Sequence, residues 1–585
     1  MRLWLLRAAV FVGLFLLAAG LFNTQVLNAR YYRSLSENNR IRLLPLEAPR
    51  GHVLDSQGRL LATNRASYHI IATPEDVIPE VFPELARLLQ VPEKVIRQRM
   101  SAEREYPFAP VTLASDISKE LLFKIEEMRP ELPGISIETR WIRYYPYKEV
   151  ASHLIGYLGK ISPEEFQKLD RARYGFNSLI GRTGIEKIFD SKIRGWRGAR
   201  QVEVNARGAL IRIISEKAPV PGEDVVLSID LEFQKRLSAL IHTRKATIAF
   251  LDLKSNELLA LVSNPGFDPN VFVSPQQSKT RAELLHDSNA PMVHRGISAV
   301  YPPGSIFKLV TAIAALERGK VTPHTTFRCP GFFRLTPDSR PFRCWWEQGH
   351  GQIDLYRALE RSCNVYFYQV GKLVGPEALA ATARDLGFGQ TFKLELSNMV
   401  PGLVPDAAWK KTKYKEPWWP GETLSYAVGQ GFLLVTPLQV LRLTSIIAKN
   451  GEWVEPKLVR DPAAPEETEK KKIAIHEENL RAIRQGMLKV VASDYGTGQL
   501  ARVDFDQLAG KTGTAQAPPR DPHAWMTGFF PYNDPQIAFV VLVEHGGSGG
   551  ITAARIVRRA IRIWKELNLD HAEDIRALPV PQPVG

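Results

Sequence analysis

The segment Leu3–Phe22 constrains this chain most, because it is an apolar run of 20 residues interrupted only by Arg7. As a helix rising about 1.5 Å per residue, it would cover about 30 Å, the thickness of a bilayer's hydrocarbon core. Arginines lie at its N-terminal end, and no acidic residue occurs before Glu37. Because positive residues stay on the cytoplasmic side, residues 1–28 are expected to form a stub and a single transmembrane anchor, with the rest outside. The alternative is a cleaved signal peptide with a weak processing site at 18–20.

The composition of the whole chain is that of a large folded protein. Its 585 residues are 44% hydrophobic and 24% charged, and this length exceeds the ~150 residues of one domain several-fold. The formal net charge of +14 suits an anionic partner such as a phospholipid surface or a cell-wall polymer. No dense Lys/Arg stripe interleaved with aromatic residues occurs, so nucleic acid is not expected as a partner. Three cysteines are too few for a disulfide-scaffold protein.

Apolar patterning predicts an α+β chain with two external parts. Residues 29–218 contain alternating runs typical of strands around 51–62 and 196–214, and helical spacing between 77 and 128. A Pro/Gly-rich segment at 218–222 marks the boundary to the second part, residues 219–572. Its predicted elements are strands at 224–230, 246–253, 257–263, 523–530 and 536–544 and helices at 231–242 and 551–567. Residues 573–585 are expected to form a flexible Pro-rich tail.

The first motif whose residues could carry out catalysis is Ser305 with Lys308. Prolines precede a helical pattern that ends at Gly319, so Ser305 is expected at the helix N-terminus, with Lys308 on the same face of the first turn. A serine hydroxyl is a poor nucleophile, and a lysine can activate it when burial and positive neighbours lower the lysine pKa. A capping serine and a solvated lysine fit the motif as well, since chance gives about two Ser-x-x-Lys motifs in a chain of this length.

Two further motifs follow in the sequence. Ser362 and Asn364 lie inside the expected helix Leu355–Leu373; both can reach a cleft if the backbone turns there, although a solvated helix face is the common alternative. Lys511-Thr512-Gly513-Thr514 combines an amine and two hydroxyls with a residue that has no side chain. This combination suits a strand edge that binds a carboxylate. A turn before a strand is the alternative, but Lys-Thr-Gly is expected by chance only ~0.15 times in such a chain.

In this order the three motifs are the signature of penicillin-binding proteins and class A β-lactamases, and the chain resembles that family. The similarity extends to further segments on both sides of residue 218, and it is closest to the class B, monofunctional members of the elongation (rod) branch. These segments are Arg50-Gly51, Asp55, Gly58, Asn64, Gly181–Lys187, Tyr301–Ser305, Gly429–Gly431, Thr436–Gln439 and Gly510–Ala515. The resemblance implies a pedestal of the dimerisation type and a transpeptidase domain, in which helices flank an antiparallel sheet beside an all-helical subdomain.

The resemblance also implies the activity, which is peptidoglycan D,D-transpeptidation through a serine acyl-enzyme. Ser305 would attack the carbonyl between the two terminal D-alanines of a stem peptide, with Lys308 as the base. Ser362 would relay the proton to the leaving amine, and Asn364 would hold the peptide amide. Lys511 would tune the pair formed by Ser362 and Lys308.

The remaining residues of the third motif are implied to bind substrate. Thr512 and Thr514 would bind the terminal carboxylate beside Gly513, and the backbone N–H groups of Ser305 and Thr514 would form the oxyanion hole. β-Lactams, which mimic the D-alanyl-D-alanine end, are expected to acylate Ser305 and inhibit the enzyme.

The chain's cysteines gather with one histidine between the first two motifs, at Cys329, Cys344, His350 and Cys363. Their spacing alone matches no compact zinc-finger pattern. The resemblance implies zinc, because elongation-type class B enzymes include members with four ligands at similar positions. Three thiolates and one imidazole would make a closed, tetrahedral structural site. One alternative is a Cys329–Cys344 disulfide in an oxidising compartment, in which case Cys363 has no disulfide partner. The other alternative is three unrelated thiols.

Other functions within the same family remain open on the sequence. A division-specific transpeptidase, a membrane-anchored penicillin sensor and a D,D-carboxypeptidase or β-lactamase carry the same motifs. The large pedestal favours an assembled synthase. No glycosyltransferase module is visible, so the resemblance implies a SEDS-type glycan polymerase and other elongation-complex proteins as partners. The expected location is the cytoplasmic (inner) membrane, with the bulk of the chain outside it.

Overall fold

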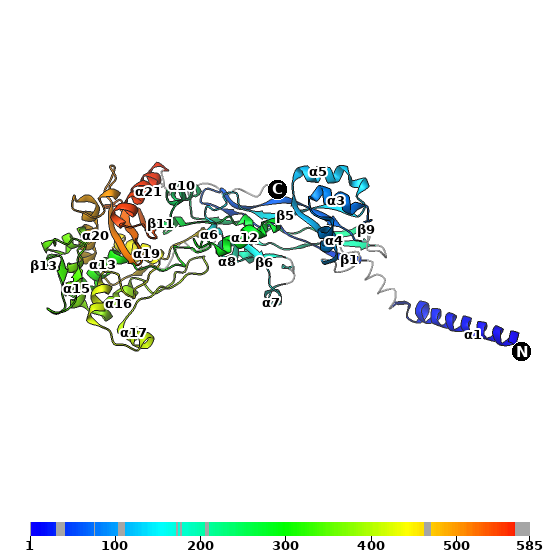
Figure 1. The fold of residues 1–585 in the computed structure, drawn as a ribbon, viewed down its shortest axis with the longest axis horizontal. Helices are drawn as coiled ribbons and strands as arrows, with labels where there is room; N and C mark the ends of the chain where they lie inside the picture. Colours follow the sequence, from blue (N-terminus) through cyan, green and yellow to red (C-terminus); the bar gives the residue numbers. More distant parts are fainter. Residues whose placement is uncertain are drawn as a thin grey trace.

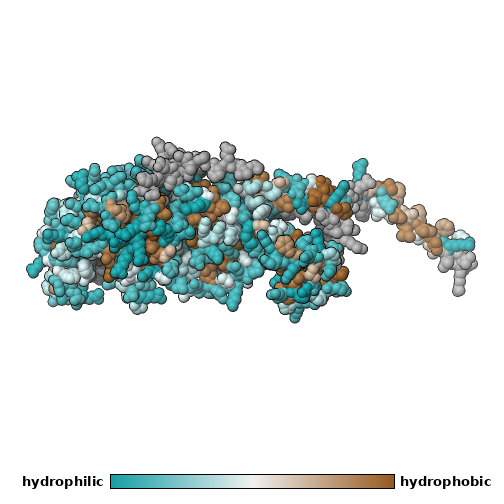
Figure 2. Space-filling model, turned by 90° about the horizontal axis from the view of Figure 1, so that it is seen from above, coloured by the Kyte–Doolittle hydropathy of each residue, from teal (hydrophilic) through white to brown (hydrophobic). Residues whose placement is uncertain are grey.

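The computed structural model describes residues 2–30, 41–74, 76–102, 111–170, 173–175, 178–204, 210–460 and 470–567. The molecule is elongated, and helix α1 (Arg2–Phe22) projects from one end (Figure 1). It continues as a π-helical turn, Asn23–Leu27, and in the described part of the chain it is the one helix long and apolar enough to cross a membrane. In Figure 2 this helix forms an apolar rod beside a body whose surface is largely hydrophilic. The tail predicted at 573–585 lies outside the described residues.

The pedestal (residues 41–218) is built on two sheets. Strands β1 (Ile41–Leu46), β8 (Gly198–Val204) and β9 (Leu210–Lys217) form an antiparallel sheet nearest to α1 (Figure 1). The second sheet contains β2 (Val53–Leu54), β3 (Leu60–Ala72), β4 (Val111–Ile117) and β5 (Ile135–Tyr144), and both β4 and β5 pair with β3. The strands predicted around 51–62 and 196–214 are therefore confirmed.

Three helices cover the second pedestal sheet. They are α3 (Val81–Leu89), α4 (Glu93–Ala102) and α5 (Lys119–Glu127), and their apolar faces bury against β3 and β4. The stretch predicted as helical between 77 and 128 thus also contains a strand, β4. Its alternation of buried Val111 and Leu113 with half-buried residues has a period of two, which is hard to see over seven residues between two helical segments. Smaller elements follow: α6 (Ser152–Ile155), β6 (Leu158–Lys160), α7 (Pro163–Phe166), β7 (Leu179–Gly181), α8 (Gly184–Ile188) and α9 (Asp190–Ile193).

A buried cluster of charges holds the pedestal segments together. Glu186 is fully buried and accepts hydrogen bonds from Arg143 Nε at 2.6 Å and Arg50 Nη2 at 2.7 Å. Arg50 also pairs with Asp190 at 2.9 Å. Burial opposes the ionisation of Glu186, but the two guanidinium groups outweigh it and lower the pKa of this carboxyl. The pedestal segments that resemble class B enzymes, Arg50-Gly51 and Gly181–Lys187, therefore meet in space.

The pedestal continues into the second part of the chain, the distal domain (residues 219–567). Strand β10 (Val225–Leu227) pairs in parallel with β2 and antiparallel with β18 (Val459–Arg460), so one sheet spans both parts. Asp55 accepts a hydrogen bond from the backbone N–H of Leu231 at 3.0 Å, at the start of helix α10 (Leu231–Ile241). A carboxylate at a helix N-terminus satisfies an N–H group that has no partner within the helix.

The distal domain is organised around a five-stranded antiparallel sheet with the order β12–β11–β22–β21–β20. The predicted strand pairs are confirmed as β11 (Ala246–Asp252) with β12 (Leu258–Asn264) and β21 (Arg520–Phe530) with β22 (Ile537–Val543). Strand β20 (Ala509–Ala517) lies at the edge and pairs only with β21 among the described strands. One face of the sheet packs on α10 and α21 (Ala554–Glu566), where Phe233, Leu237 and Trp564 are buried.

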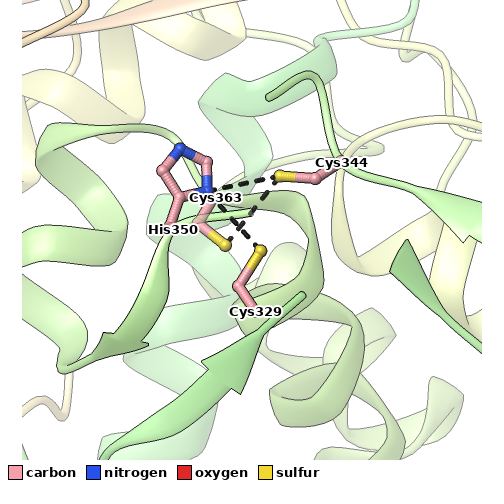
Figure 3. Close-up of side chains that lie close together, drawn as sticks. All are labelled: Cys329, Cys344, His350 and Cys363. Carbon is pink, nitrogen blue, oxygen red and sulfur yellow. Dashed lines mark hydrogen bonds between the residues drawn. The ribbon is translucent and has the colours of Figure 1, made fainter. Parts of the chain in front are cut away.

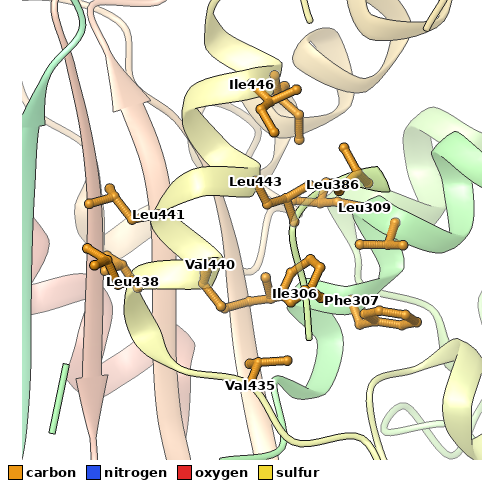
Figure 4. Close-up of a cluster of buried hydrophobic side chains, with 14 of the residues drawn as sticks. Ile306, Phe307, Leu309, Leu386, Val435, Leu438, Val440, Leu441, Leu443 and Ile446 are labelled. Carbon is orange, nitrogen blue, oxygen red and sulfur yellow. The ribbon is translucent and has the colours of Figure 1, made fainter. Parts of the chain in front are cut away.

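The opposite face of the sheet packs on helices that carry the site. Along β22, Val540 and Leu542 belong to this core, whereas Phe539 and Val541 belong to the α10–α21 core, as the period of two requires. Figure 4 shows α19 (Pro437–Ala448) lying between the sheet and α13 (Lys308–Glu317), with apolar side chains filling the space. Helix α20 (Glu477–Ala492) packs beside β20.

A mainly helical subdomain completes the distal domain. Its helices are α14 (Leu355–Glu360), α15 (Asn364–Val374), α16 (Pro376–Asp385), α17 (Ala407–Tyr414) and α18 (Pro420–Ala427). Its short strands are β13 (Phe327–Cys329), β14 (Phe332–Phe333), β15 (Phe342–Arg343) and β16 (Gly351–Ile353). The other small elements are α11 (Asn270–Val273), α12 (Ser278–His286), β17 (Glu452–Trp453) and β19 (Lys471–Lys472). The predicted α+β class, with an antiparallel sheet flanked by helices, is confirmed.

Candidate active site

Ser305 lies in a tight turn between the sheet and helix α13. The turn, Gly304–Phe307, is a 3-10 helix that continues directly into α13, so the predicted helix is confirmed with a tighter first turn. Gly304 has φ +55° and donates its N–H to Gly429 O at 2.9 Å. A Cβ on Gly304 would lie 3.0 Å from Thr514 O on β20, so glycine allows this close approach. Ser305 itself is half-buried.

The amine of Lys308 is buried and fully hydrogen-bonded. Its Nζ donates to Ser362 O at 2.7 Å, to Ser362 Oγ at 3.2 Å and to Asn364 Oδ1 at 2.7 Å. Burial in the apolar core lowers the pKa of Lys308 to about 8, since removal from water disfavours the charged form. At a pKa of about 8 a minor fraction of this amine is neutral at pH 7 and able to accept a proton, and that fraction grows as the pH rises.

The second motif lies at a break between two helices, which corrects the single helix predicted over Leu355–Leu373. Helix α14 ends at Glu360 and α15 begins at Asn364. Ser362 has φ +51°, and Cys363 caps α15 through its sulfur, which accepts from the Tyr366 N–H at 3.4 Å. Because the backbone turns here, Ser362 and Asn364 both point to Lys308, as the motif's chemistry requires.

Lys511 approaches the same hydroxyl from the sheet. Its Nζ donates to Ser362 Oγ at 3.0 Å and to Thr512 O at 2.9 Å. Burial and the neighbouring Lys308 lower the pKa of Lys511 well below its ordinary value. The Ser362 hydroxyl thus joins two buried amines, and all three predicted motifs meet at one place.

The rest of the third motif occupies the edge strand, as predicted. A Cβ on Gly513 would lie 3.0 Å from Pro303 O and 3.0 Å from Trp525 Cβ, so the absence of a side chain allows β20 to pack on the Ser305 turn. Thr514 is exposed, whereas Thr512 is buried. An exposed hydroxyl beside an edge strand is available to a ligand.

Two residues that contact strand β20, Thr497 and Gly549, were not predicted from the sequence. Thr497 Oγ1 lies 2.7 Å from Thr512 Oγ1, and the N–H of Gly549 donates to Thr514 Oγ1 at 3.2 Å. A single threonine carries no sequence signal. The glycine-rich run at 546–550 was a usable signal, because such runs mark close approaches of the backbone.

The four predicted metal-ligating residues come together beside the second motif (Figure 3). Their donor atoms all lie within 4.8 Å of one another: His350 Nδ1 is 3.6 Å from Cys329 Sγ and 3.5 Å from Cys344 Sγ, and Cys344 Sγ is 4.0 Å from Cys363 Sγ. A tetrahedral zinc ion with Zn–S of ~2.3 Å and Zn–N of ~2.0 Å needs S···S of about 3.8 Å and S···N of about 3.5 Å. The three cysteines are free thiols. The residues present therefore fit a tetrahedral ion.

Two family models match the chain. The penicillin-binding protein dimerisation domain matches residues 45–227, and the penicillin-binding protein transpeptidase domain matches residues 246–562.

The chain is also similar to proteins of this kind over nearly its whole length. A protein of Haemophilus influenzae named peptidoglycan D,D-transpeptidase MrdA is 31% identical, over 98% of this chain and 93% of that protein. The penicillin-binding protein PBP2 of Helicobacter pylori, solved in complex with MreC, is 29% identical with a TM-score of 0.81, over 90% of this chain and 99% of that one. A chain in a solved peptidoglycan synthase complex, described as coordinating polymerization and crosslinking, is 30% identical with a TM-score of 0.73, over 100% of both chains.

The motifs, the domain pair and the full-length similarity agree with one another, and the predicted resemblance is confirmed. This chain belongs to the family of penicillin-binding proteins that carry a dimerisation domain and a transpeptidase domain.

Proposed function

We propose that this protein is a serine-type peptidoglycan D,D-transpeptidase of cell-wall elongation. The observation that supports the proposal is the buried amine of Lys308, which donates hydrogen bonds to Ser362 and Asn364. The amine of Lys511 donates to the same Ser362 hydroxyl. Ser305 lies in the turn, Gly304–Phe307, that leads into Lys308. The name of the Haemophilus influenzae relative supports the reaction type.

In this mechanism neutral Lys308 takes the proton of Ser305 while its Oγ attacks the carbonyl carbon between the two terminal D-alanines. The tetrahedral intermediate collapses by breaking the C–N bond, and the proton passes through Ser362 to the departing D-alanine amine. Asn364 holds the peptide amide, and the Lys511 amine donates to the same Ser362 hydroxyl that accepts from Lys308. The amine of a second stem peptide then attacks the ester carbonyl carbon, the bond from that carbon to Ser305 Oγ breaks, and the amine's proton returns through Lys308 to Ser305 Oγ, which leaves a new peptide bond.

The edge strand would position the donor peptide. The exposed Thr514 hydroxyl is available to the terminal carboxylate, with Thr512 in support and Gly513 allowing close approach of the backbone. The N–H groups of Ser305 and Thr514 would stabilise the oxyanion, whose negative charge develops only during reaction.

Labelling with a fluorescent penicillin tests the nucleophile. Ser305→Ala is expected to abolish covalent labelling, whereas the exposed Ser278→Ala keeps it. Stoichiometric labelling of Ser305→Ala would refute the assignment. Product analysis with an added acceptor amine then separates the alternatives, since dimers mean transfer, monomers mean hydrolysis, and a stable acyl-enzyme without product means a sensor.

We also propose an anchored location and an elongation role. Helix α1 supports a single membrane anchor with the pedestal and distal domain outside. The neighbours solved with MreC and in a peptidoglycan synthase complex support elongation-complex proteins, including a SEDS-type polymerase, as partners. Depletion of the protein is expected to give rounded cells; filamentation would indicate the division role instead.

We further propose that Cys329, Cys344, His350 and Cys363 hold a structural zinc ion. The tetrahedral spacing of their donor atoms supports this, as does their burial. The ion would brace the 330–351 loop against the start of α15, next to Ser362. Metal analysis of protein purified without chelators is expected to give one zinc per chain, and Cys363→Ser to lower it. Absence of zinc with two thiols blocked would favour the disulfide.

A further inference from the structure

Two of the three cysteines face each other where the 330–351 loop meets the second motif. The Sγ atoms of Cys344 and Cys363 lie 4.0 Å apart (Figure 3). A disulfide bond has an S–S length of about 2.05 Å, so a combined movement of roughly 2 Å joins the two sulfur atoms. Metal binding and disulfide exchange both use the thiolate form of cysteine. These two residues therefore have the chemistry for either state.

Hydrogen bonds already join the residues on either side of the two cysteines. Trp345 Nε1 donates to Arg361 O at 2.8 Å, and Asn364 Nδ2 donates to Arg343 O at 3.4 Å. The two chain segments are thus held against each other before and after the facing sulfur atoms. A disulfide needs backbones that approach in this way, because its reach from Cα to Cα is short.

Cys344 is the cysteine that a reagent from solvent meets first. It is 4% exposed, against 1% for Cys329 and 0% for Cys363. The two residues that follow it, Trp345 and Trp346, are 52% and 45% exposed, so this side of the cluster lies close to the surface. The first exchange step is therefore expected at Cys344, and Cys363 supplies the second, resolving thiolate.

A new bond at Cys363 acts directly on the partners of the catalytic lysine. Cys363 lies between Ser362 and Asn364, and both of these accept hydrogen bonds from Lys308 Nζ. The Cys363 sulfur also accepts the Tyr366 N–H at 3.4 Å and so caps α15, and this cap is lost when the sulfur turns away. Because a misplacement of about 1 Å in an active site can cost about 100-fold in rate, the oxidised protein should react slowly with penicillin.

Oxidation and the proposed metal binding exclude each other. A disulfide sulfur carries no negative charge, so an oxidised cluster keeps only the thiolate of Cys329 and the imidazole of His350 as ligands. A closed structural zinc site uses four ligands. The disulfide therefore removes the brace of the 330–351 loop in the same step that displaces the second motif.

We propose that Cys344 and Cys363 form a redox modification site. A disulfide between them dismantles the zinc site and switches off acylation of Ser305, and reduction in the presence of zinc restores both. This inference rests on the proposed zinc site and on the proposed transpeptidase function.

The oxidant in this proposal is a disulfide, either a small molecule or part of another protein. The Cys344 thiolate attacks one sulfur of the oxidant and expels the other sulfur as a thiolate, which gives a mixed disulfide. The Cys363 thiolate then attacks the Cys344 sulfur, forms the new S–S bond and expels the second half of the oxidant. The two cysteines lose two electrons in total, and the oxidant takes them up as it becomes two thiols.

Oxidised glutathione tests the proposal with the full-length protein in detergent, purified in the reduced state with zinc. A chromogenic chelator measures the zinc released, and mass spectrometry of peptides digested without reductant locates the disulfide. We expect zinc release in step with formation of the Cys344–Cys363 disulfide. The rate of acylation by a fluorescent penicillin should fall by about tenfold to 100-fold, and dithiothreitol with zinc should restore it.

Two variants form a matched comparison, because each removes one of the four ligands. Cys329→Ser keeps the proposed pair, so oxidised glutathione should still form the disulfide and slow the reaction with penicillin. Cys344→Ser lacks the pair, so the same treatment should leave its rate unchanged. Each variant is compared with its own reduced state, which removes any difference in starting activity.

The disulfide map of the wild-type protein decides the inference even if both variants fold poorly. A disulfide that contains Cys329, a Cys344–Cys363 disulfide with an unchanged acylation rate, or three thiols that resist the oxidant would overturn it. Reduced protein that carries no zinc refutes the metal proposal instead, and the disulfide and the acylation rate are still measured. Reduced protein that does not react with penicillin refutes the proposed function itself.

Discussion

Replacing Glu186 by glutamine tests the physical account of the pedestal most directly. The carboxylate lies between Arg143 and Arg50, and the side chains of Glu186 and Arg143 are both 0% exposed. Arg50 keeps Asp190 as a second partner. Among the described residues, Arg143 then keeps the carbonyl oxygen of Gly51, at 2.7 Å, but no carboxylate, so its positive charge becomes uncompensated in the protein interior.

The size of the effect follows from burial. Removing one partner of a buried ion pair costs about 3–5 kcal/mol, because the other charge stays buried and unpaired. Glu165 and Arg182 provide a matched control: they form a pair of the same types at the same 2.6 Å, but with side chains 38% and 28% exposed. Exposed pairs contribute about 0–1 kcal/mol, so Glu165→Gln is expected to change little.

Urea unfolding of the full-length protein in detergent, followed by far-UV circular dichroism, measures the difference. Glu186→Gln should shift the pedestal transition to clearly lower urea, and Glu165→Gln should not. The pKa of Glu186 is lowered in the folded protein, so its contribution is present above the ordinary carboxyl pKa and is lost as the pH falls through the folded value. Equal shifts for both variants, or a gap that persists at strongly acidic pH, would refute the reasoning.

Three further outcomes are expected. Acylation of Ser305 by a fluorescent penicillin should accelerate as the pH rises through about 8, where Lys308 loses its proton; a flat profile in stopped-flow measurements would contradict Lys308 as the base. Gly513→Ala should cost about 1–3 kcal/mol through overpacking and slow acylation, because the new Cβ meets Pro303 O and Trp525 Cβ at 3.0 Å; unchanged urea midpoint and rate would argue against this contact. Asp55→Ala should cost about 1–3 kcal/mol, since the fully buried Asp55 accepts from the N–H of Leu231; proteolysis between pedestal and distal domain should become faster, and an unchanged rate would show that this contact does not couple them.

Much of the fold could be predicted from local patterns. The apolar run that became α1, the strand pairs β11–β12 and β21–β22 and the helix α10 each carry their own periodicity, and local periodicity reflects which faces must be buried. Strand β4 was missed because its alternation is short and lies between helices. The break at Ser362 was missed for a different reason: the residues on both sides favour helix, and the turn with φ +51° is stabilised by contacts to Lys308 and Lys511, which lie far away in the sequence.

By itself, the sequence determined which groups are available: a nucleophile, two amines, an amide, an edge strand and three thiols with an imidazole. Only the tertiary structure decided that both amines reach one hydroxyl in a site closed to water, and that four donor atoms from separate segments lie within 4.8 Å of one another. It also created a pocket lined by Phe342, Trp418 and Phe432 among others, whose walls come from segments that have no common pattern. The physical reason is that pKa, coordination and pocket shape depend on distances and burial between residues far apart in the chain, which local sequence does not encode.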